Sequence, residues 1–293
     1  MAAHPLPEAE LSVHDEIGDY RRDLEAHPPQ LPSPTDKIPW IVRHLSEDVK
    51  AKHADLIFLF CYFLSGLCDS TAYRAWGCFV SMQTGNTIFL GLGTSNTLEQ
   101  TTYDWLKSLV SILSFLAGSS AYSKTRYFRP QSRSALVGNF GSQCLILITA
   151  ASMLQLGVIE DSNKEKGVHT LLKLIPLALV AFQCAGQMAA SRLLEFPELP
   201  TTMLTSLYYD LVADPGIFRP LSKNTMRNRR VTAIIGVIGG ATIGGWLFTS
   251  TGRVSTALWV AAASKLVISA IWFFWKQENR NSNKPHTAAD PVT

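Results

Sequence analysis

Residues 65–91 read SGLCDSTAYRAWGCFVSMQTGNTIFLG, and this stretch decides the fold. It is apolar enough to lie in a membrane, yet it contains an acid, Asp69, a base, Arg74, and the polar run Gln83–Thr87. In hydrocarbon every backbone N–H and C=O needs a partner, so irregular backbone persists only inside protein or beside a water-filled cavity. The stretch is therefore either a packed defect in a membrane protein or a binding site.

The rest of the 293-residue chain separates into polar ends and an apolar middle. Several runs between the ends approach the ~20 residues that cross a ~30 Å hydrocarbon core. The second and sixth apolar segments differ from the others, because one is interrupted at Gln83–Thr87 and the other is too short to cross. The eight segments are 54–74, 76–93, 105–123, 135–157, 171–191, 201–213, 230–250 and 254–275.

The positions of basic residues outside the apolar segments indicate which segments cross the membrane. They cluster at 43–52, 124–133, 219–230 and 276–284, and positive residues mark the cytoplasmic side of a membrane protein. All four clusters fall on one side only if the second and sixth segments enter and return, or lie within the bundle. We therefore predict an all-α, polytopic membrane helix bundle with six crossings, two short or broken segments, and both termini in the cytoplasm.

A weak internal repeat supports this count. Ser65-Gly66 recurs as Ala185-Gly186, and Met82-x-Thr84-Gly85 recurs as Met203-x-Thr205-Ser206. With three crossings in each half, the second half is inverted relative to the first, which is a transporter architecture with the site at the repeat interface. The predicted domains are a cytoplasmic tail, disordered and then interfacial (1–53), a first membrane repeat (54–157), an external loop (158–170), a second membrane repeat (171–275) and a cytoplasmic tail (276–293).

The same motifs resemble those of a known family. Gly66-x-x-Asp69, Tyr73, Gly77-x-Phe79, the run Met82-x-Thr84-Gly85-Asn86-Thr87 and Leu90-Gly91 are similar to the signature of the YoaK-like (UPF0700) proteins, an uncharacterised multipass transmembrane family. In the second half, Gln187 stands where members often show Gln-Asn, with Met188 in place of the Asn. The resemblance implies six spans and an integral membrane location, and it implies no established activity.

Polar residues inside the apolar segments form the predicted substrate- or ion-binding site, which consists of Asp69, Gln83, Thr84, Gly85, Asn86, Gln187, Thr205 and Lys265. An intramembrane carboxylate is costly, so Asp69 has either an internal role or a position near the outer end, where it meets Arg74 or water. Residues 84–86 suit an unwound turn lining a cavity, or they satisfy one another where two helices cross.

Lys265 stands in the middle of segment 254–275, where a cation is most costly. We expect it to face the bundle and to pair with a carboxylate, either Asp69 or Asp210. The alternative is a lipid-facing lysine that extends its ammonium toward the membrane surface. If the first expectation holds, Asp69, Asn86 and Lys265 point into one interior, with Thr84 and Gly85 beside them and Thr205 across the two-fold axis.

Cysteines and glycines have simpler explanations. All five cysteines fall in apolar runs without metal-site spacing, so we expect small buried apolar side chains. Gly236, Gly240 and Gly244 recur every four residues, which favours close packing of helices within the chain over dimerisation.

The sequence favours two function classes, with a membrane enzyme as a third and weaker alternative. No HExxH, P-loop or GxSxG motif is present, so we predict no enzymatic activity, and we predict no cofactor, no metal and no nucleic-acid partner. The first hypothesis is a small secondary transporter or channel-like protein for a small polar solute or ion in a lipid bilayer. The second is a non-transporting membrane protein, such as an assembly factor, a lipid-binding protein or an adaptor. The sequence leaves open the substrate, the membrane and the oligomeric state.

Overall fold

The computed structural model describes residues 39–95, 104–127, 129–157, 171–196, 198–199 and 201–277. Over these residues the regular secondary structure is helical, with two isolated β-bridges. The chain divides into two compact units, Met1–His44 and Leu45–Thr293. In the first unit the described residues belong to the short helix α2 (Trp40–Leu45), where the Trp40 and His44 rings stack at 5.4 Å. The predictions of a disordered tail and of an external loop at 158–170 lie outside the described residues.

The second unit contains the helices that correspond to the apolar segments. Five of them are long and apolar enough to cross a membrane, namely α3 (Asp55–Trp76), α6 (Arg133–Gln155), α8 (Leu174–Leu193), α10 (Thr225–Thr251) and α11 (Val254–Phe274). Large apolar side chains such as Ile235, Trp246 and Leu266 lie exposed on α10 and α11. Continuous exposed apolar surface of this kind fits lipid rather than water. The protein is therefore an integral, multi-pass membrane protein.

The other helices of the second unit are shorter or less apolar. They are α4 (Gln83–Thr94), α5 (Asp104–Ser123) and α9 (Thr205–Val212), with single 3₁₀ turns at η2 (Lys124–Tyr127) and η3 (Leu221–Lys223). At 12 and 8 residues, α4 and α9 are too short to cross, and the length of α9 agrees with the predicted short sixth segment. One expectation was wrong: the polar run that begins at Gln83 is helical, and the chain breaks earlier, at 77–82. The reason is Gly77, whose left-handed backbone (φ 73°) ends α3.

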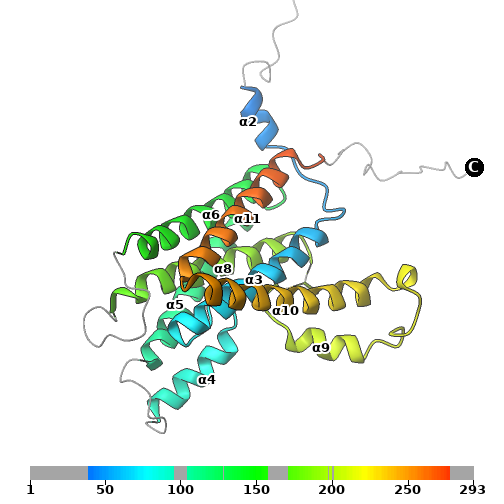
Figure 1. Cartoon of the computed structure of the whole chain (residues 1–293). Helices are drawn as coiled ribbons and strands as arrows, with labels where there is room; N and C mark the ends of the chain where they lie inside the picture. Colours follow the sequence, from blue (N-terminus) through cyan, green and yellow to red (C-terminus); the bar gives the residue numbers. More distant parts are fainter. Residues whose placement is uncertain are drawn as a thin grey trace, which may run out of the picture. The chain divides into compact units, whose positions relative to one another are not determined.

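Helix α3 is the centre of the bundle. It packs against α10, α11 and α8, while α6 packs against α11 and α8, and α5 packs against α8 and α4 (Figure 1). Glycines allow the closest of these contacts. A side chain added at Gly240 would overlap the carbonyl of Phe63, and one added at Gly244 would lie 2.8 Å from the carbonyl oxygen of Leu67. The prediction that this glycine face packs within the chain is confirmed.

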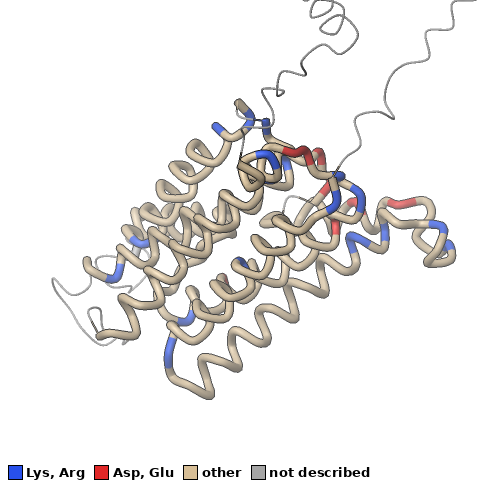
Figure 2. The backbone as a smooth tube through the Cα atoms, turned by 90° about the horizontal axis from the view of Figure 1, so that it is seen from above, with Lys and Arg blue, Asp and Glu red and all other residues tan. Residues whose placement is uncertain are grey.

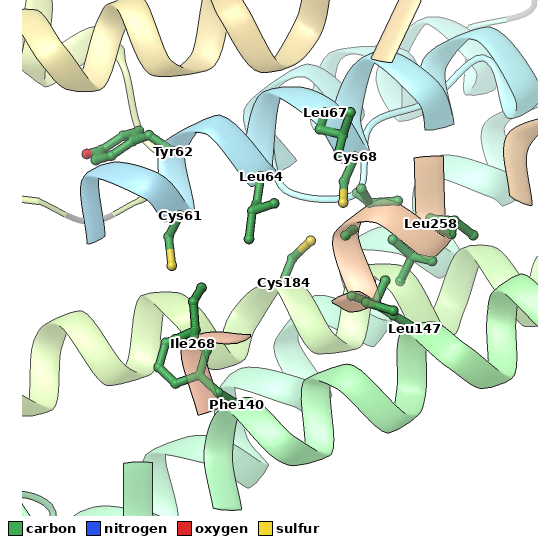
Figure 3. Close-up of a cluster of buried hydrophobic side chains, with 14 of the residues drawn as sticks. Cys61, Tyr62, Leu64, Leu67, Cys68, Phe140, Leu147, Cys184, Leu258 and Ile268 are labelled. Atoms are coloured by element: carbon green, nitrogen blue, oxygen red, sulfur yellow. The ribbon is translucent and has the colours of Figure 1, made fainter. Parts of the chain in front are cut away.

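Apolar side chains fill the space between these helices. Figure 3 shows Cys61 and Cys68 on α3, and Cys184 on α8, pointing into the interior with Leu64. All five cysteines are buried and free, which confirms that they serve as small apolar side chains. Phe58, Tyr62, Phe140 and Trp272 are the largest apolar or aromatic side chains of this core.

Charged residues gather at one end of the second unit, which we call the basic end (Figure 2). Residues 47–53 cross this end as a strap, with the Val49 N–H bonded to the Gln131 carbonyl and the Lys50 N–H to the Lys276 carbonyl. The Arg133 guanidinium donates to Glu47 at 2.7 Å and to the Trp275 carbonyl. The start of α10 joins them, because Arg229 pairs with Asp55 at the start of α3. Chain regions from all four predicted basic clusters thus meet at one end.

The turn from α9 to α10 is built around Asp214, which lies outside the apolar helices. Its carboxylate accepts hydrogen bonds from the Asn224 side chain (3.0 Å) and the Gly216 N–H (2.7 Å), with Arg230 at 3.5 Å. These hydrogen bonds, led by the one from Asn224, hold the pKa of Asp214 below its usual value. The Asn224 side chain also caps α10 by accepting the N–H of Arg227, so the acid orients the cap.

Candidate functional site

Asp69 stabilises the break between α3 and α4. Its side chain is 4% exposed, and its Oδ1 accepts the N–H groups of Val80 and Ser81, each at 2.8 Å. Its Oδ2 accepts the Ser81 hydroxyl at 2.5 Å. Backbone N–H groups that leave helical geometry inside a membrane need such partners, and a carboxylate is a strong one. Asp69 therefore stabilises the irregular backbone of residues 80–81 by accepting its N–H groups.

Asn86 closes the same break from the other side. Its Oδ1 accepts the Phe79 N–H (2.9 Å), and its Nδ2 donates to the Phe79 carbonyl (2.7 Å). The Nδ2 also lies within hydrogen-bond distance of Gln83 Oε1 (2.8 Å) and of Ser111 Oγ on α5 (3.0 Å). Gln83 donates in turn to the Val80 carbonyl (3.0 Å). Gln83 and Asn86 are thus occupied in pairing backbone groups of Phe79 and Val80.

Three predicted site residues lie elsewhere than expected. Thr84 and Thr205 are exposed in the first turns of α4 and α9, so neither lies in the interior where we expected it. Because α4 is helical from Gln83, Asn86 faces inward and Thr84, two residues earlier, faces outward. Gly85 is half-buried beneath the Phe79 ring, and an added Cβ would lie 2.8 Å from that ring.

A second polar group surrounds Lys265, and we call it the Lys265 chain. The Lys265 side chain is 1% exposed, and its Nζ donates to Gln187 Oε1 at 2.6 Å. Gln187 Nε2 donates to Ser65 Oγ (2.6 Å) and to the Cys61 carbonyl (3.3 Å). Ser65 Oγ donates to the carbonyl of Thr201 (2.7 Å). The chain therefore joins α11, α8, α3 and the segment that precedes α9.

The environment of Lys265 is neutral, contrary to the expected pairing with a carboxylate. Besides its hydrogen bond to Gln187, its Nζ lies 5.3 Å from the centroid of the Phe140 ring, which also stabilises a cation. Asp210, the other expected partner, lies 3.9 Å from Arg230 instead. Among the ion pairs of the described residues, none involves Asp69 or Lys265. The two buried charges thus belong to separate clusters, although Ser65 and Asp69 are only one turn apart on α3.

Several buried polar atoms near the Lys265 chain have no partner among the described residues. They are Thr201 Oγ1, Gln183 Oε1 and Gln143 Oε1. Gln183 lies one turn before Gln187 on α8, and the Gln143 amide lies against Gly186. An unsatisfied buried polar group costs about 1–3 kcal/mol. The interior around Lys265 therefore has unused acceptors and an ammonium with donors to spare.

Sequence reasoning missed part of both clusters. Ser65 was visible only as a member of a repeated motif, and Ser81, Ser111 and Thr201 were not identified as site residues. A serine or threonine in an apolar run is ordinary, so only its position in space reveals which partner it serves. Over the described ranges, no three His, Cys, Asp or Glu side chains come together as metal ligands.

Comparison with known proteins gives one family. Residues 57–271 match the family described as "Protein of unknown function (DUF1275)". No curated protein and no solved structure gives a significant match. The match includes both polar clusters, and it names no relative, so the narrower YoaK-like label stays a prediction. Since the match extends over more than half of the sequence, the chain belongs to the DUF1275 family.

Proposed function

We propose that this protein is a small secondary transporter or channel-like protein for a small polar solute or ion, without enzymatic activity. The observation that carries the proposal is the buried ammonium of Lys265, which has a single, neutral hydrogen-bond acceptor within the described part of the chain. A lysine used only as structural glue would be expected to have a carboxylate partner, because an unpaired buried charge is strongly destabilising. An intramembrane ionisable residue without such a partner favours a substrate, ion or proton pathway.

The arrangement of the two halves supports an internal repeat, and with three crossings in each half we propose that this repeat is inverted. If α3, α4, α5 and α6 correspond to α8, α9, α10 and α11, the contact α3–α10 should have a counterpart α8–α5, and α6–α8 should have α11–α3. All four contacts occur. Glycines repeat the pattern: an added side chain at Gly240 would overlap the Phe63 carbonyl of α3, and one at Gly118 would overlap the Phe182 carbonyl of α8. The Lys265 chain links residues of both halves, where transporters place their sites.

The strap supports an even number of crossings in our proposal. The Lys50 N–H, before α3, bonds to the Lys276 carbonyl, after α11, so both residues lie at the same end of the bundle. Five helices qualify by apolarity, and α5 is the sixth in our proposal. It is 20 residues long, packs along α8, and contains Asp104, Lys107 and six serines in an otherwise largely apolar sequence. The basic end would then face the cytoplasm, together with both termini.

A ligand screen on two matched variants tests the proposal. Thermal unfolding of purified protein would be measured with Na⁺, K⁺, chloride, phosphate and a panel of small metabolites. A substrate should raise the midpoint of the parent and of Lys223→Gln, an exposed control, but not that of Lys265→Gln. Flux of that solute into liposomes should depend on Lys265 in the same way. Equal stabilisation of all three proteins, or no flux above protein-free liposomes, would refute the assignment.

One observation favours the alternative, a non-transporting assembly, lipid-binding or adaptor protein. Both Asp69 and Asn86 are fully occupied in holding the break, which is a structural task. If the Lys265 chain is structural as well, Lys265→Gln should lower the unfolding midpoint without altering any ligand response. The same two measurements therefore separate the two functions.

A further inference from the structure

A hollow of about 770 Å³ lies at the basic end, between the strap and the last turns of α11. None of the predicted site residues contributes to it. Its lining consists of Lys50, Lys52, His53, Val267, Ala270, Ile271, Phe274, Trp275 and Lys276. The hollow is thus separate from both polar clusters of the interior.

Hydrogen bonds fix the rim of this hollow. The Lys50 N–H donates to the Lys276 carbonyl (3.1 Å), and the Trp275 Nε1–H donates to the Lys50 carbonyl (2.8 Å). Val49, which precedes Lys50 in the strap, is 1% exposed and forms a β-bridge with Gln277. The backbone of the strap is therefore tied to the end of α11, while the lysine side chains remain available.

The lining has two chemical parts. One wall is the outer face of α11, where Val267, Ile271 and Phe274 are exposed, Phe274 by 80%. The rim carries the ammonium groups of Lys50, Lys52 and Lys276, and no Asp or Glu is among the lining residues. None of the ion pairs of the described residues involves these three lysines. An apolar wall below a cationic rim matches the two parts of an anionic phospholipid.

We propose that this hollow binds one anionic phospholipid, with the phosphate at the three lysines and an acyl chain along α11. The apolar wall favours a lipid over a soluble phosphate, because a free phosphate would leave Ile271 and Phe274 uncovered. Basic pockets beside transmembrane helices on the cytoplasmic side are recognised sites for anionic headgroups. The proposal is independent of whether the protein transports a solute.

Lipid binding to the full-length protein tests this site. The probes are phosphatidylglycerol and phosphatidylcholine with identical chains, titrated into detergent-purified protein and counted by native mass spectrometry. One phosphatidylglycerol should bind at least tenfold more tightly than phosphatidylcholine. A variant with Lys50→Gln, Lys52→Gln and Lys276→Gln should lose roughly a hundredfold in affinity, since each lysine near an anionic surface contributes about fivefold.

A charge-matched control isolates the hollow from the general charge of this end. It replaces Lys124, Arg219 and Lys223 by Gln, and all three are exposed residues outside the lining. This control should bind phosphatidylglycerol as the parent does. The strap bonds are made by backbone groups and Trp275, so both triple variants should fold.

Four results would overturn the proposal. They are equal binding of the two lipids, an equal loss in the control variant, tight binding of soluble glycerol phosphate, and lipid binding that appears only after removal of residues 278–293. The second would assign the affinity to diffuse surface charge, the third to a free phosphate, and the fourth to the C-terminal segment as the occupant. A preference for phosphatidylglycerol that is lost only with the lining lysines would establish the site.

Discussion

Replacing Asp69 tests whether the carboxylate holds the break between α3 and α4. Both backbone donors, the N–H groups of Val80 and Ser81, bond to the same oxygen, Oδ1. Asp69→Asn keeps an oxygen at this position, whereas Asp69→Leu removes it. The two variants therefore separate the charge of the side chain from its capacity to accept hydrogen bonds.

The expected magnitudes follow from these bonds. A hydrogen bond to a charged group contributes about 1.5–3 kcal/mol and a neutral one about 1 kcal/mol, so Asp69→Asn should lose roughly 2 kcal/mol from two bonds. Relief of the cost of burying a charge offsets part of this loss. Asp69→Leu leaves two buried N–H groups unpaired, which costs about 2–6 kcal/mol in total. The unfolding midpoints should fall in the order parent, Asn, Leu.

Hydrogen exchange is the local assay for this reasoning. The amides of Val80 and Ser81 should exchange faster in Asp69→Leu than in Asp69→Asn, while amides in the middle of α11 should change less. Ser81→Ala serves as a control, because it removes only the hydroxyl bond to Oδ2 and keeps both N–H bonds. If Asp69→Leu were as stable as Asp69→Asn, with the same exchange at residues 80–81, the assigned role of Asp69 would be wrong.

Three further predictions concern packing, pH and topology. Gly240→Leu should separate α3 from α10 and lower stability by roughly 1–3 kcal/mol or more in thermal unfolding, whereas Gly245→Leu, which points into open space, should have little effect. Because the pKa of Asp214 is lowered by folding, its stabilisation is present above the unfolded pKa of ~3.9 and is lost as pH falls through the folded value, so parent and Asp214→Asn should differ at pH 7 and converge in strong acid. In a cysteine-free background, Ser95→Cys should label from outside intact cells and Lys124→Cys only after permeabilisation; the reverse would refute the proposed orientation.

Hydropathy predicted the long helices well, because length and apolarity are properties of a segment by itself. The predicted segments 135–157 and 254–275 differ from α6 and α11 by only a few residues. The start of α10 was placed at residue 230, whereas the helix begins at Thr225. The first turns of α10 contain Arg227, Arg229 and Arg230, and a search for apolar segments excludes these residues. The backbone hydrogen bonds of a helix do not depend on side-chain polarity, so the helix extends beyond the apolar segment.

The location of the break could not be read from polarity alone. The sequence places its polar residues at Gln83–Thr87, and the natural inference was that the helix unwinds there. In the structure the irregular backbone comes first, at 77–82, and the polar side chains that follow return to satisfy it. A polar run in a membrane segment can thus mark the partners of a break rather than the break itself, because the unpaired backbone groups need donors and acceptors from a neighbouring regular helix.

Unpaired backbone groups at the break also explain why the two buried charges, Asp69 and Lys265, are not paired with each other. The cost of placing Asp69 and Lys265 in a membrane is visible from sequence, but that cost does not identify the group that offsets it. Asp69 lies within reach of two backbone N–H groups that have no helical partner, and these groups occupy its Oδ1, while the Ser81 hydroxyl occupies its Oδ2. Lys265 is left with an amide oxygen and an aromatic ring. Among the described residues, a carboxylate committed to the backbone therefore leaves a cation in the interior without a fixed counter-charge, and the proposed transport of a solute or ion rests on this feature.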